Sequence, residues 1–126
     1  MRPGESASAC ILVVEDDERV RALVRTALEM NGYQVLEAGN GYDALKLCRE
    51  FRGEIDLLLM DVVLPGFSGQ SLAARAAAVS PGIRVLYMSG YPDTTVAQHG
   101  VPPELVFVHK PVSLPDLIAN VGAVLR

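Results

Sequence analysis

Six polar or charged side chains stand at the ends of apolar runs that lie far apart in this 126-residue chain. They are Glu15, Asp16, Asp17, Asp61, Ser89 and Lys110. Clustered carboxylates without histidine or cysteine nearby favour a hard divalent cation such as Mg²⁺. A cation, an ammonium group and a hydroxyl group together can hold the oxygens of a phosphoryl group. In such a site Asp61 is the candidate nucleophile, and it would form an acyl phosphate.

The apolar runs before these side chains predict strands that are covered on both faces, because the runs are short and mostly apolar throughout. The five expected strands cover residues 10–14, 34–38, 55–60, 84–88 and 105–109. Apolar residues at helical spacing follow each run. The expected helices cover residues 20–28, 44–51, 71–79, 94–99 and 114–125, of which 94–99 is the shortest.

Small and polar residues mark the ends of these elements. Asp17 and Ser113 are the expected N-caps of the first and last helices. Gly32 stands where the first helix should stop. Gly66 and Gly69 are expected to serve the turn after the third strand, where the backbone needs freedom.

Five strand–helix units imply a parallel sheet, because each parallel return needs a crossover connection. The predicted fold is therefore a doubly wound α/β fold, (βα)5, with five parallel strands between two layers of helices. Periodicity alone does not determine the strand order. Ligands of open α/β sheets bind beyond the carboxyl ends of the strands. The six side chains should therefore meet at one edge of the sheet.

Composition excludes several other classes of protein. Half of the chain is hydrophobic, which is enough for a core, and the net charge is −4. An acidic domain without a basic run is a poor binder of nucleic acid, and no apolar stretch approaches the roughly 20 residues that span a membrane. Residues 1–63 hold 12 acidic and 7 basic side chains, whereas residues 64–126 hold 3 and 4. The acid is therefore concentrated in the first half.

Residues 1–9 are expected to be a flexible leader, and residues 10–126 a single domain. Cys10 and Cys48 lie in apolar surroundings without the spacing of a metal site. They are expected to be buried free thiols in a reducing compartment, the cytoplasm.

Four separated motifs resemble those of the receiver domains of two-component response regulators. They are ILVVEDD at residues 11–17, LLLMDVVLPGFSG at 57–69, YMSGY at 87–91 and VFVHKP at 106–111. The motifs occur in the family's order, and the resemblance covers residues 10–125. It implies a flavodoxin-like sheet with strand order 2-1-3-4-5.

The resemblance implies that Asp61 is the phosphoacceptor and that Mg²⁺ is the cofactor. Asp16 matches the direct metal ligand, and Glu15 matches the acid that acts through water. The backbone carbonyl of Val63 would complete the protein's share of the coordination. A second reading pairs Asp16 with Asp17, but the position of the acids after the strand favours Glu15 and Asp16. Glu15 is a variation on the family's usual acid.

Further roles are implied for residues of the second half. Ser89 and Lys110 match the residues that hold the phosphoryl oxygens. Phe107 occupies the aromatic switch position, although a core phenylalanine would fit the sequence equally well. Pro111 stands where these domains carry a cis peptide bond.

The resemblance implies a phosphoacceptor domain that takes a phosphoryl group from a sensor histidine kinase or a histidine phosphotransfer protein, and then changes conformation. It would catalyse transfer onto itself and turn over no separate substrate. A weak homodimer through the fourth helix, fifth strand and fifth helix is a further expectation. The YMSGYPD segment at residues 87–93 looks more like the receiver of a hybrid sensor kinase than like a DNA-binding regulator. A stand-alone relay protein remains the other interpretation.

Three alternatives stay open at this point. A pseudo-receiver would bind partners without phosphorylation. A flavodoxin-like cofactor binder would need a phosphate loop after the first strand, where this chain has acids that would repel a phosphate. A Mg²⁺-dependent phosphatase with an aspartate nucleophile would want a second aspartate in place of Val63.

Overall fold

A parallel sheet lies at the centre of the computed structural model, which describes residues 9–61, 63–64, 67–89, 107–109 and 113–126. Its five strands run in the order β2-β1-β3-β6-β7. They are β1 (Cys10–Val14), β2 (Gln34–Ala38), β3 (Leu57–Asp61), β6 (Arg84–Ser89) and β7 (Phe107–His109). All of the pairings in this sheet are parallel. The predicted fold class and strand order are confirmed.

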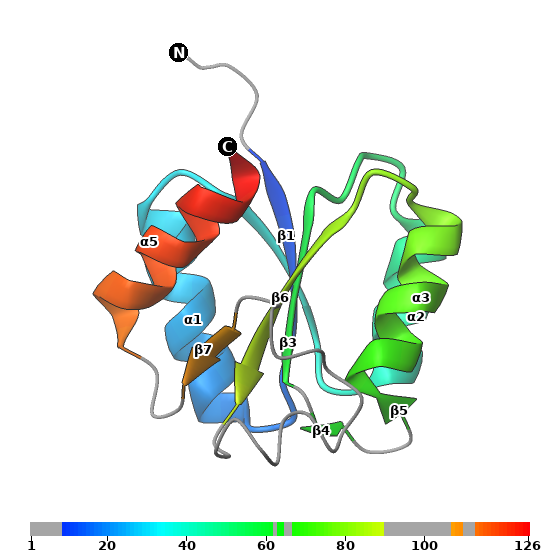
Figure 1. The fold of residues 1–126 in the computed structure, drawn as a ribbon, viewed down its shortest axis with the longest axis horizontal. Coiled ribbons are helices and arrows are strands. Elements are labelled where there is room, and N and C mark those ends of the chain that lie inside the picture. The colour runs from blue at the N-terminus through cyan, green and yellow to red at the C-terminus, as the bar shows by residue number, and fades with distance from the viewer. Residues whose placement is uncertain (1–8, 62, 65–66, 90–106, 110–112) are drawn as a thin grey trace.

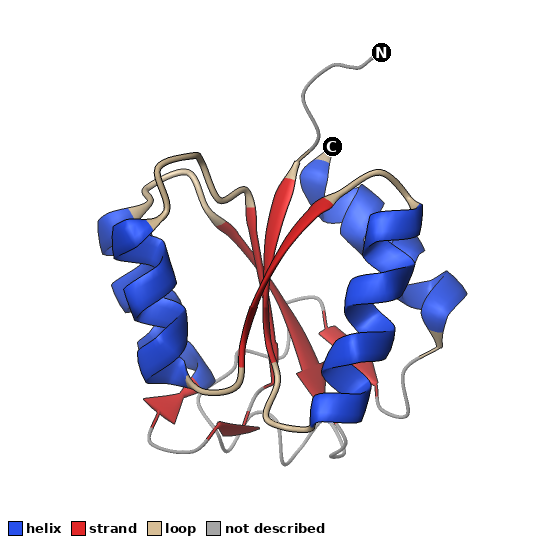
Figure 2. Ribbon diagram, turned by 180° about the vertical axis from the view of Figure 1, so that it is seen from behind, coloured by secondary structure: helices blue, strands red, loops and turns tan. Residues whose placement is uncertain are grey.

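Helices cover both faces of the sheet and complete three layers (Figure 1). On one face lie α1 (Glu18–Met30) and α5 (Leu114–Leu125), and on the other lie α2 (Gly41–Glu50) and α3 (Gly69–Val79). Figure 2 shows the same layers from behind. The helix expected at residues 94–99 falls outside the described residues.

Alternating side chains of the central strands build a core on each face. Ile11 and Val13 of β1 pack in the core beneath α1 and α5, while Leu12 and Val14 pack beneath α2 and α3. This alternation follows from the period of two residues in a strand. All five residues of β1 are buried, as are all five of β3. Each buried aliphatic side chain stabilises the fold by about 1.5–3 kcal/mol.

The helix-end signals are confirmed. The side chain of Asp17 accepts hydrogen bonds from the N–H groups of Arg19 at 2.9 Å and Val20 at 3.3 Å. Ser113 is the N-cap of α5. Gly32, just beyond α1, has a φ of +89°, a conformation that side chains with a Cβ rarely adopt.

The segment after β3 differs from the expectation. A two-stranded antiparallel sheet forms there, from β4 (Val63–Leu64) and β5 (Phe67–Ser68). The sequence predicted only a turn in this segment, because strands of two residues are too short to show periodicity. In addition, β3 begins at Leu57 rather than at residue 55, although Ile55 is still buried in the core.

Both cysteines are free and buried, as predicted. Burial, helped by the negative charge of Asp56, raises the pKa of the Cys10 thiol to about 11. Burial also raises the pKa of the Cys48 thiol. Within the described part of the chain, no helix has the length and apolar character needed to cross a membrane.

Candidate functional site

The register of the sheet brings the ends of β1 and β3 to the same level. Val14 pairs with Met60, so Glu15 and Asp61 are the next residues along two neighbouring strands. The N–H of Glu15 donates to the carbonyl of Ala38 at 3.1 Å, which continues the pairing of β1 with β2 past the end of β1. This hydrogen bond ties the N–H side of Glu15 to the sheet.

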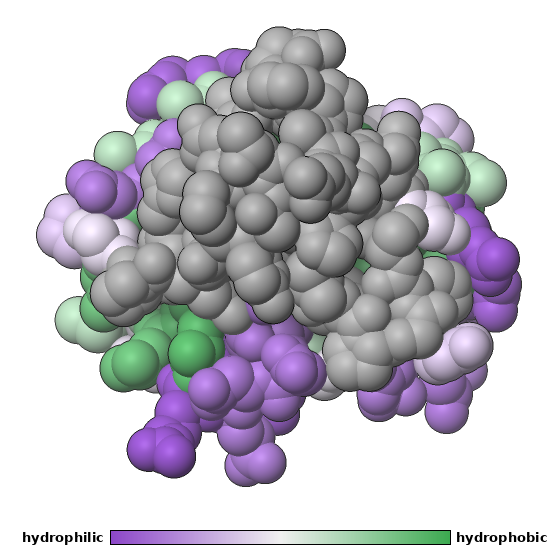
Figure 3. Space-filling view, turned by 60° about the horizontal axis from the view of Figure 1, so that its bottom comes forward, coloured by the Kyte–Doolittle hydropathy of each residue, from purple (hydrophilic) through white to green (hydrophobic). Residues whose placement is uncertain are grey.

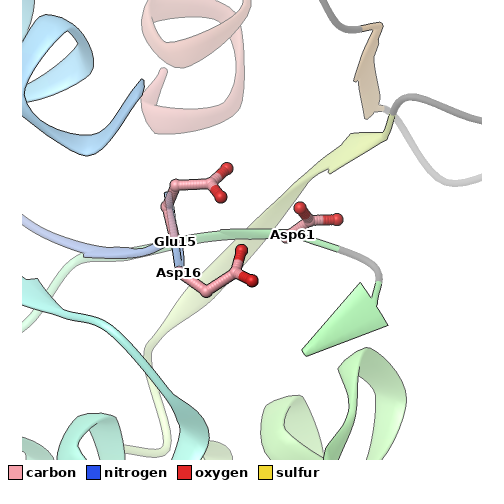
Figure 4. Close-up of side chains that lie close together, drawn as sticks. All are labelled: Glu15, Asp16 and Asp61. Carbon is pink, nitrogen blue, oxygen red and sulfur yellow. The ribbon is translucent and has the colours of Figure 1, made fainter. Parts of the chain in front are cut away.

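Three carboxylates gather at this edge, those of Glu15, Asp16 and Asp61. One carboxylate oxygen from each lies within 4.8 Å of the others, and Figure 4 shows the three side chains close together. Glu15 is fully buried and Asp61 is 8% exposed, while Asp16 is exposed. Two negative charges about 4 Å apart repel by about 4 kcal/mol at an effective dielectric near 20. A bound cation would offset this repulsion.

The donor set of this cluster fits Mg²⁺. It consists of carboxylate oxygens from Glu15, Asp16 and Asp61, which are hard ligands suited to Mg²⁺ rather than to zinc or copper. One of the carboxylates is open to solvent, and Mg²⁺ usually keeps several of its waters. The sequence prediction that these three residues meet is confirmed.

Hydrogen bonds hold Glu15 through both its side chain and its backbone. Its Oε2 accepts from the N–H of Asp17 at 3.0 Å, and its carbonyl accepts from Nη1 of Arg21 at 2.8 Å. Asp17 itself caps α1, as predicted, while Glu15 and Asp16 are the acids that meet Asp61. The turn from β1 to α1 is thus fixed at several points.

Arg21 belongs to a charged network that the sequence analysis missed. Its Nε donates to Oε1 of Glu37 on β2 at 3.3 Å, and Nη1 of Arg25 donates to the other oxygen of Glu37 at 2.7 Å. Glu37 raises the pKa of Arg25 through this hydrogen bond and through its charge. The spacing of two arginines one helical turn apart was visible in the sequence. Their acidic partner depends on the strand order, which periodicity does not give.

Three of the other expected site residues lie in strands. Val63 begins β4, two residues after Asp61. Ser89 ends β6, one residue beyond Met88, which is the partner of Asp61 in the sheet. Phe107 begins β7 opposite Tyr87. Lys110 and Pro111 lie outside the described residues.

Described polar and apolar residues lie next to each other at the rim of this end of the molecule (Figure 3). Figure 3 turns the molecule so that this end comes forward, and its described residues show hydrophilic and hydrophobic patches side by side. In the part of the chain that the structure describes, Glu15, Asp16 and Asp61 form the group of carboxylates that could hold a metal ion.

Comparison with known proteins gives the family directly. The sequence model described as response regulator receiver domain matches residues 11–122. The chain is 36% identical to the sensor kinase CckA of Brucella abortus over 96% of its own length, but it spans only 13% of that protein. It is 31% identical to the response regulator receiver protein CpdR of the same organism, and the match covers 91% of this chain and 95% of CpdR.

A solved structure shares the fold. The receiver domain from the hybrid histidine kinase CckA superposes with a TM-score of 0.79 at 34% identity, covering 94% of this chain and all of that one. The motifs, the strand order and the acidic cluster agree with these relationships. The chain belongs to the family of response regulator receiver domains, the signalling modules of two-component systems.

Proposed function

We propose that Asp61 accepts a phosphoryl group from a phosphohistidine donor, in a site that uses Mg²⁺ held by Glu15, Asp16 and Asp61. The observation that carries this proposal is the meeting of three carboxylates within 4.8 Å at the ends of two neighbouring strands. A cluster of like charges in which two carboxylates, those of Glu15 and Asp61, are buried is costly to a fold. Its presence at the ligand-binding edge of the sheet therefore favours a functional role.

The transfer is a substitution at phosphorus. A carboxylate oxygen of Asp61 forms a bond to phosphorus as the bond from phosphorus to the donor's imidazole nitrogen breaks, and the imidazole keeps the electron pair. A bound Mg²⁺ would neutralise charge on the phosphoryl oxygens and on the clustered carboxylates. Asp16 would serve as a direct ligand, Glu15 would act through a water molecule, and the backbone carbonyl of Val63 would add a further oxygen.

Ser89 and Lys110 hold the remaining phosphoryl oxygens in this proposal. The position of Ser89 supports its role, because β6 pairs with β3 up to Asp61. A shift of Ser89 can reach β7 and the proposed switch residue Phe107, since β6 and β7 are hydrogen-bonded neighbours. Lys110 and Pro111, the latter with its expected cis peptide bond, follow β7 directly in sequence.

The donor is a sensor histidine kinase or a histidine phosphotransfer protein. An apolar groove of about 440 Å³ between α1 and α5 offers it a docking surface. Leu23 and Met30, both on α1, are 59% and 81% exposed there. Exposed apolar patches on otherwise polar surfaces mark interaction sites. The groove lies along the second half of α1, from Leu23 to the C-cap residue Asn31, so a partner seated there would bind the helical face of the domain rather than the carboxylates themselves.

The scope of the proposal follows from the same residues. In this proposal residues 10–126 are the receiver domain, and the domain catalyses transfer only onto itself. If the chain is part of a hybrid kinase, the kinase activity resides in other domains. The two free, buried thiols fit a reducing compartment such as the cytoplasm. The weak homodimer through the expected fourth helix, β7 and α5 stays a prediction.

Intact-mass spectrometry after incubation with acetyl phosphate and Mg²⁺ tests this function. We expect the wild-type chain to gain the mass of one phosphoryl group, and Asp61→Asn to gain none. Asp56→Asn is the matched control, because Asp56 stands next to the other end of β3. It should be labelled like the wild type.

Two results would contradict the proposal. Labelling of Asp61→Asn at the wild-type level would place the acceptor elsewhere. A wild-type chain that stays unlabelled, with acetyl phosphate and with a phosphohistidine donor alike, would favour the pseudo-receiver interpretation.

A further inference from the structure

We infer that Arg21 is a positioning residue for the acidic cluster. Its guanidinium group fixes the backbone of Glu15, and thereby the place at which the Glu15 carboxylate meets those of Asp16 and Asp61. This inference rests on the proposed function, because it assigns Arg21 a part in the binding of Mg²⁺ at that cluster.

The contacts of Arg21 link α1 to the ends of two strands. Nη1 donates to the carbonyl of Glu15 at 2.8 Å, and Nε donates to Oε1 of Glu37 at 3.3 Å. The side chain of Arg21 is 20% exposed, compared with 41% for Arg25. A guanidinium group presents its donors in a rigid fork, so two simultaneous hydrogen bonds restrict its orientation strongly.

The surroundings of Arg21 leave it little freedom. Glu37 is itself held by Arg25 at 2.7 Å and by the pairing of β2 with Val13 of β1. A Cβ atom at Gly39 would stand 3.2 Å from Nη1 of Arg21, which is closer than ordinary van der Waals contact. The guanidinium group thus lies against the backbone at the end of β2, in a space that the absence of a side chain at Gly39 leaves open.

This arrangement adds positive charge beside the cluster without occupying it. Arg21 binds a backbone carbonyl and the carboxylate of Glu37, so neither bond uses an oxygen of the three clustered carboxylates. A residue that orients a group of a metal site from behind influences metal affinity strongly, and its loss costs about 10–100-fold in affinity or activity. Arg21 stands in that relation to Glu15.

A purely structural role for Arg21 predicts something different. Arg21 and Arg25 both bind Glu37 from α1, so either one could serve to attach the helix to β2. Only Arg21 also contacts Glu15. Arg25→Met therefore removes the same charge and a contact to the same carboxylate while leaving Glu15 held, which makes it the matched control for Arg21→Met.

Titration with Mg²⁺, followed by the NMR shifts of backbone amides, measures the effect without any phosphoryl transfer. We expect Arg21→Met to raise the dissociation constant of Mg²⁺ about tenfold. Arg25→Met should remain within about twofold of the wild type, because exposed ion pairs contribute little. Before Mg²⁺ is added, the amide of Asp17, which donates to the Glu15 carboxylate, should shift in Arg21→Met and not in Arg25→Met.

A conservative variant keeps the test decisive if Arg21→Met does not fold. Arg21→Lys retains the charge and can make one of the two hydrogen bonds, so it should lie between the wild type and Arg21→Met in Mg²⁺ affinity. If Arg21→Met binds Mg²⁺ with the same affinity as Arg25→Met, the inference is overturned. If only Arg21→Lys folds, equal affinities of Arg21→Lys and Arg25→Met overturn it. Mg²⁺ binding by a wild type that takes no phosphoryl group would instead count against the proposed function alone.

Discussion

An aspartate stands at each end of β3, and the two are held in opposite ways. Asp56 immediately precedes the strand at the amino edge of the sheet, while Asp61 is its last residue at the carboxyl edge. Asp56 meets backbone N–H groups. Asp61 meets two other carboxylates.

The contacts of Asp56 join three strands. Its Oδ2 accepts from the N–H of Cys10 at 2.8 Å, and its own N–H donates to the carbonyl of Cys10 at 2.9 Å. Its carbonyl accepts from the N–H of Arg84 at 3.0 Å. Asp56 thereby links the starts of β1, β3 and β6, and its carboxylate is used to support the fold.

Asp61 lies at the other end of the same strand, and its surroundings carry a cost. It is 8% exposed, and its carboxylate lies with those of Glu15 and Asp16. The same residue type therefore accepts a backbone hydrogen bond at one edge and lies beside two like charges at the other. The comparison shows that a carboxylate's partners, rather than its place in a strand, indicate whether it serves the fold or the site.

The stabilisation of the fold by Mg²⁺ should give the largest difference between variants at the two edges of the sheet. At a concentration 100 times its dissociation constant, Mg²⁺ should raise the free energy of unfolding of the wild type by about 2.7 kcal/mol. Chemical denaturation with and without Mg²⁺ measures this. The gain should disappear in Asp61→Asn and persist in Asp56→Asn. Equal gains in the two variants would break the comparison.

Removal of the amino-edge carboxylate should give the next largest effect. Asp56→Ala should lower the free energy of unfolding by about 2 kcal/mol, because it removes a hydrogen bond between a charged group and the Cys10 N–H. Denaturant titration measures the loss. Asp56→Asn keeps an acceptor oxygen and should lose less. An unchanged free energy of unfolding in Asp56→Ala would show that the amino edge of the sheet does not depend on this side chain.

Removal of a carboxylate at the carboxyl edge should raise the free energy of unfolding rather than lower it. Without Mg²⁺, Asp61→Asn should raise the free energy of unfolding by about 1 kcal/mol, because it relieves repulsion from Glu15 and Asp16. The gain should shrink as salt is added, since salt screens the exposed charge of Asp16. A loss of stability would mean that Asp61 supports the fold as Asp56 does.

The smallest effect concerns the thiol beside Asp56. The pKa of Cys10 is raised from 9.0 to about 11 in the folded chain, so its contribution to stability is complete below pH 9 and is lost as the pH rises through about 11. Between neutral pH and about pH 9.5 the loss should stay below about 1 kcal/mol. Denaturation across this range, with Cys10→Ala as the control, measures it. An unchanged pH dependence in Cys10→Ala would contradict this assignment.

The main features of the fold could be predicted because they depend on patterns within single segments. Continuous apolar runs predicted β1 and β3, and the position of Asp17 before an amphipathic segment predicted the N-cap of α1. That acids after the first strand would meet Asp61 followed from one further rule, that parallel strands end at a common edge. The choice of Glu15 and Asp16 among those acids came from the family resemblance.

What could not be predicted depends on distances across the sheet. The network of Arg21, Arg25 and Glu37 joins side chains of α1 to one of β2, and neither periodicity nor the strand order that the resemblance implies shows which side chains meet there. The β4–β5 pair is too short to show a pattern. The structural role of Asp56 arises from a backbone N–H, which the sequence does not display.

The central claim is that Asp61, and no other aspartate, carries the phosphoryl group. Borohydride reduces an acyl phosphate on aspartate to homoserine, and peptide mass spectrometry locates the product. After treatment with acetyl phosphate and Mg²⁺, we expect homoserine at position 61 and unchanged aspartate at positions 16 and 56. Homoserine at either of those positions, or at none, would contradict the claim.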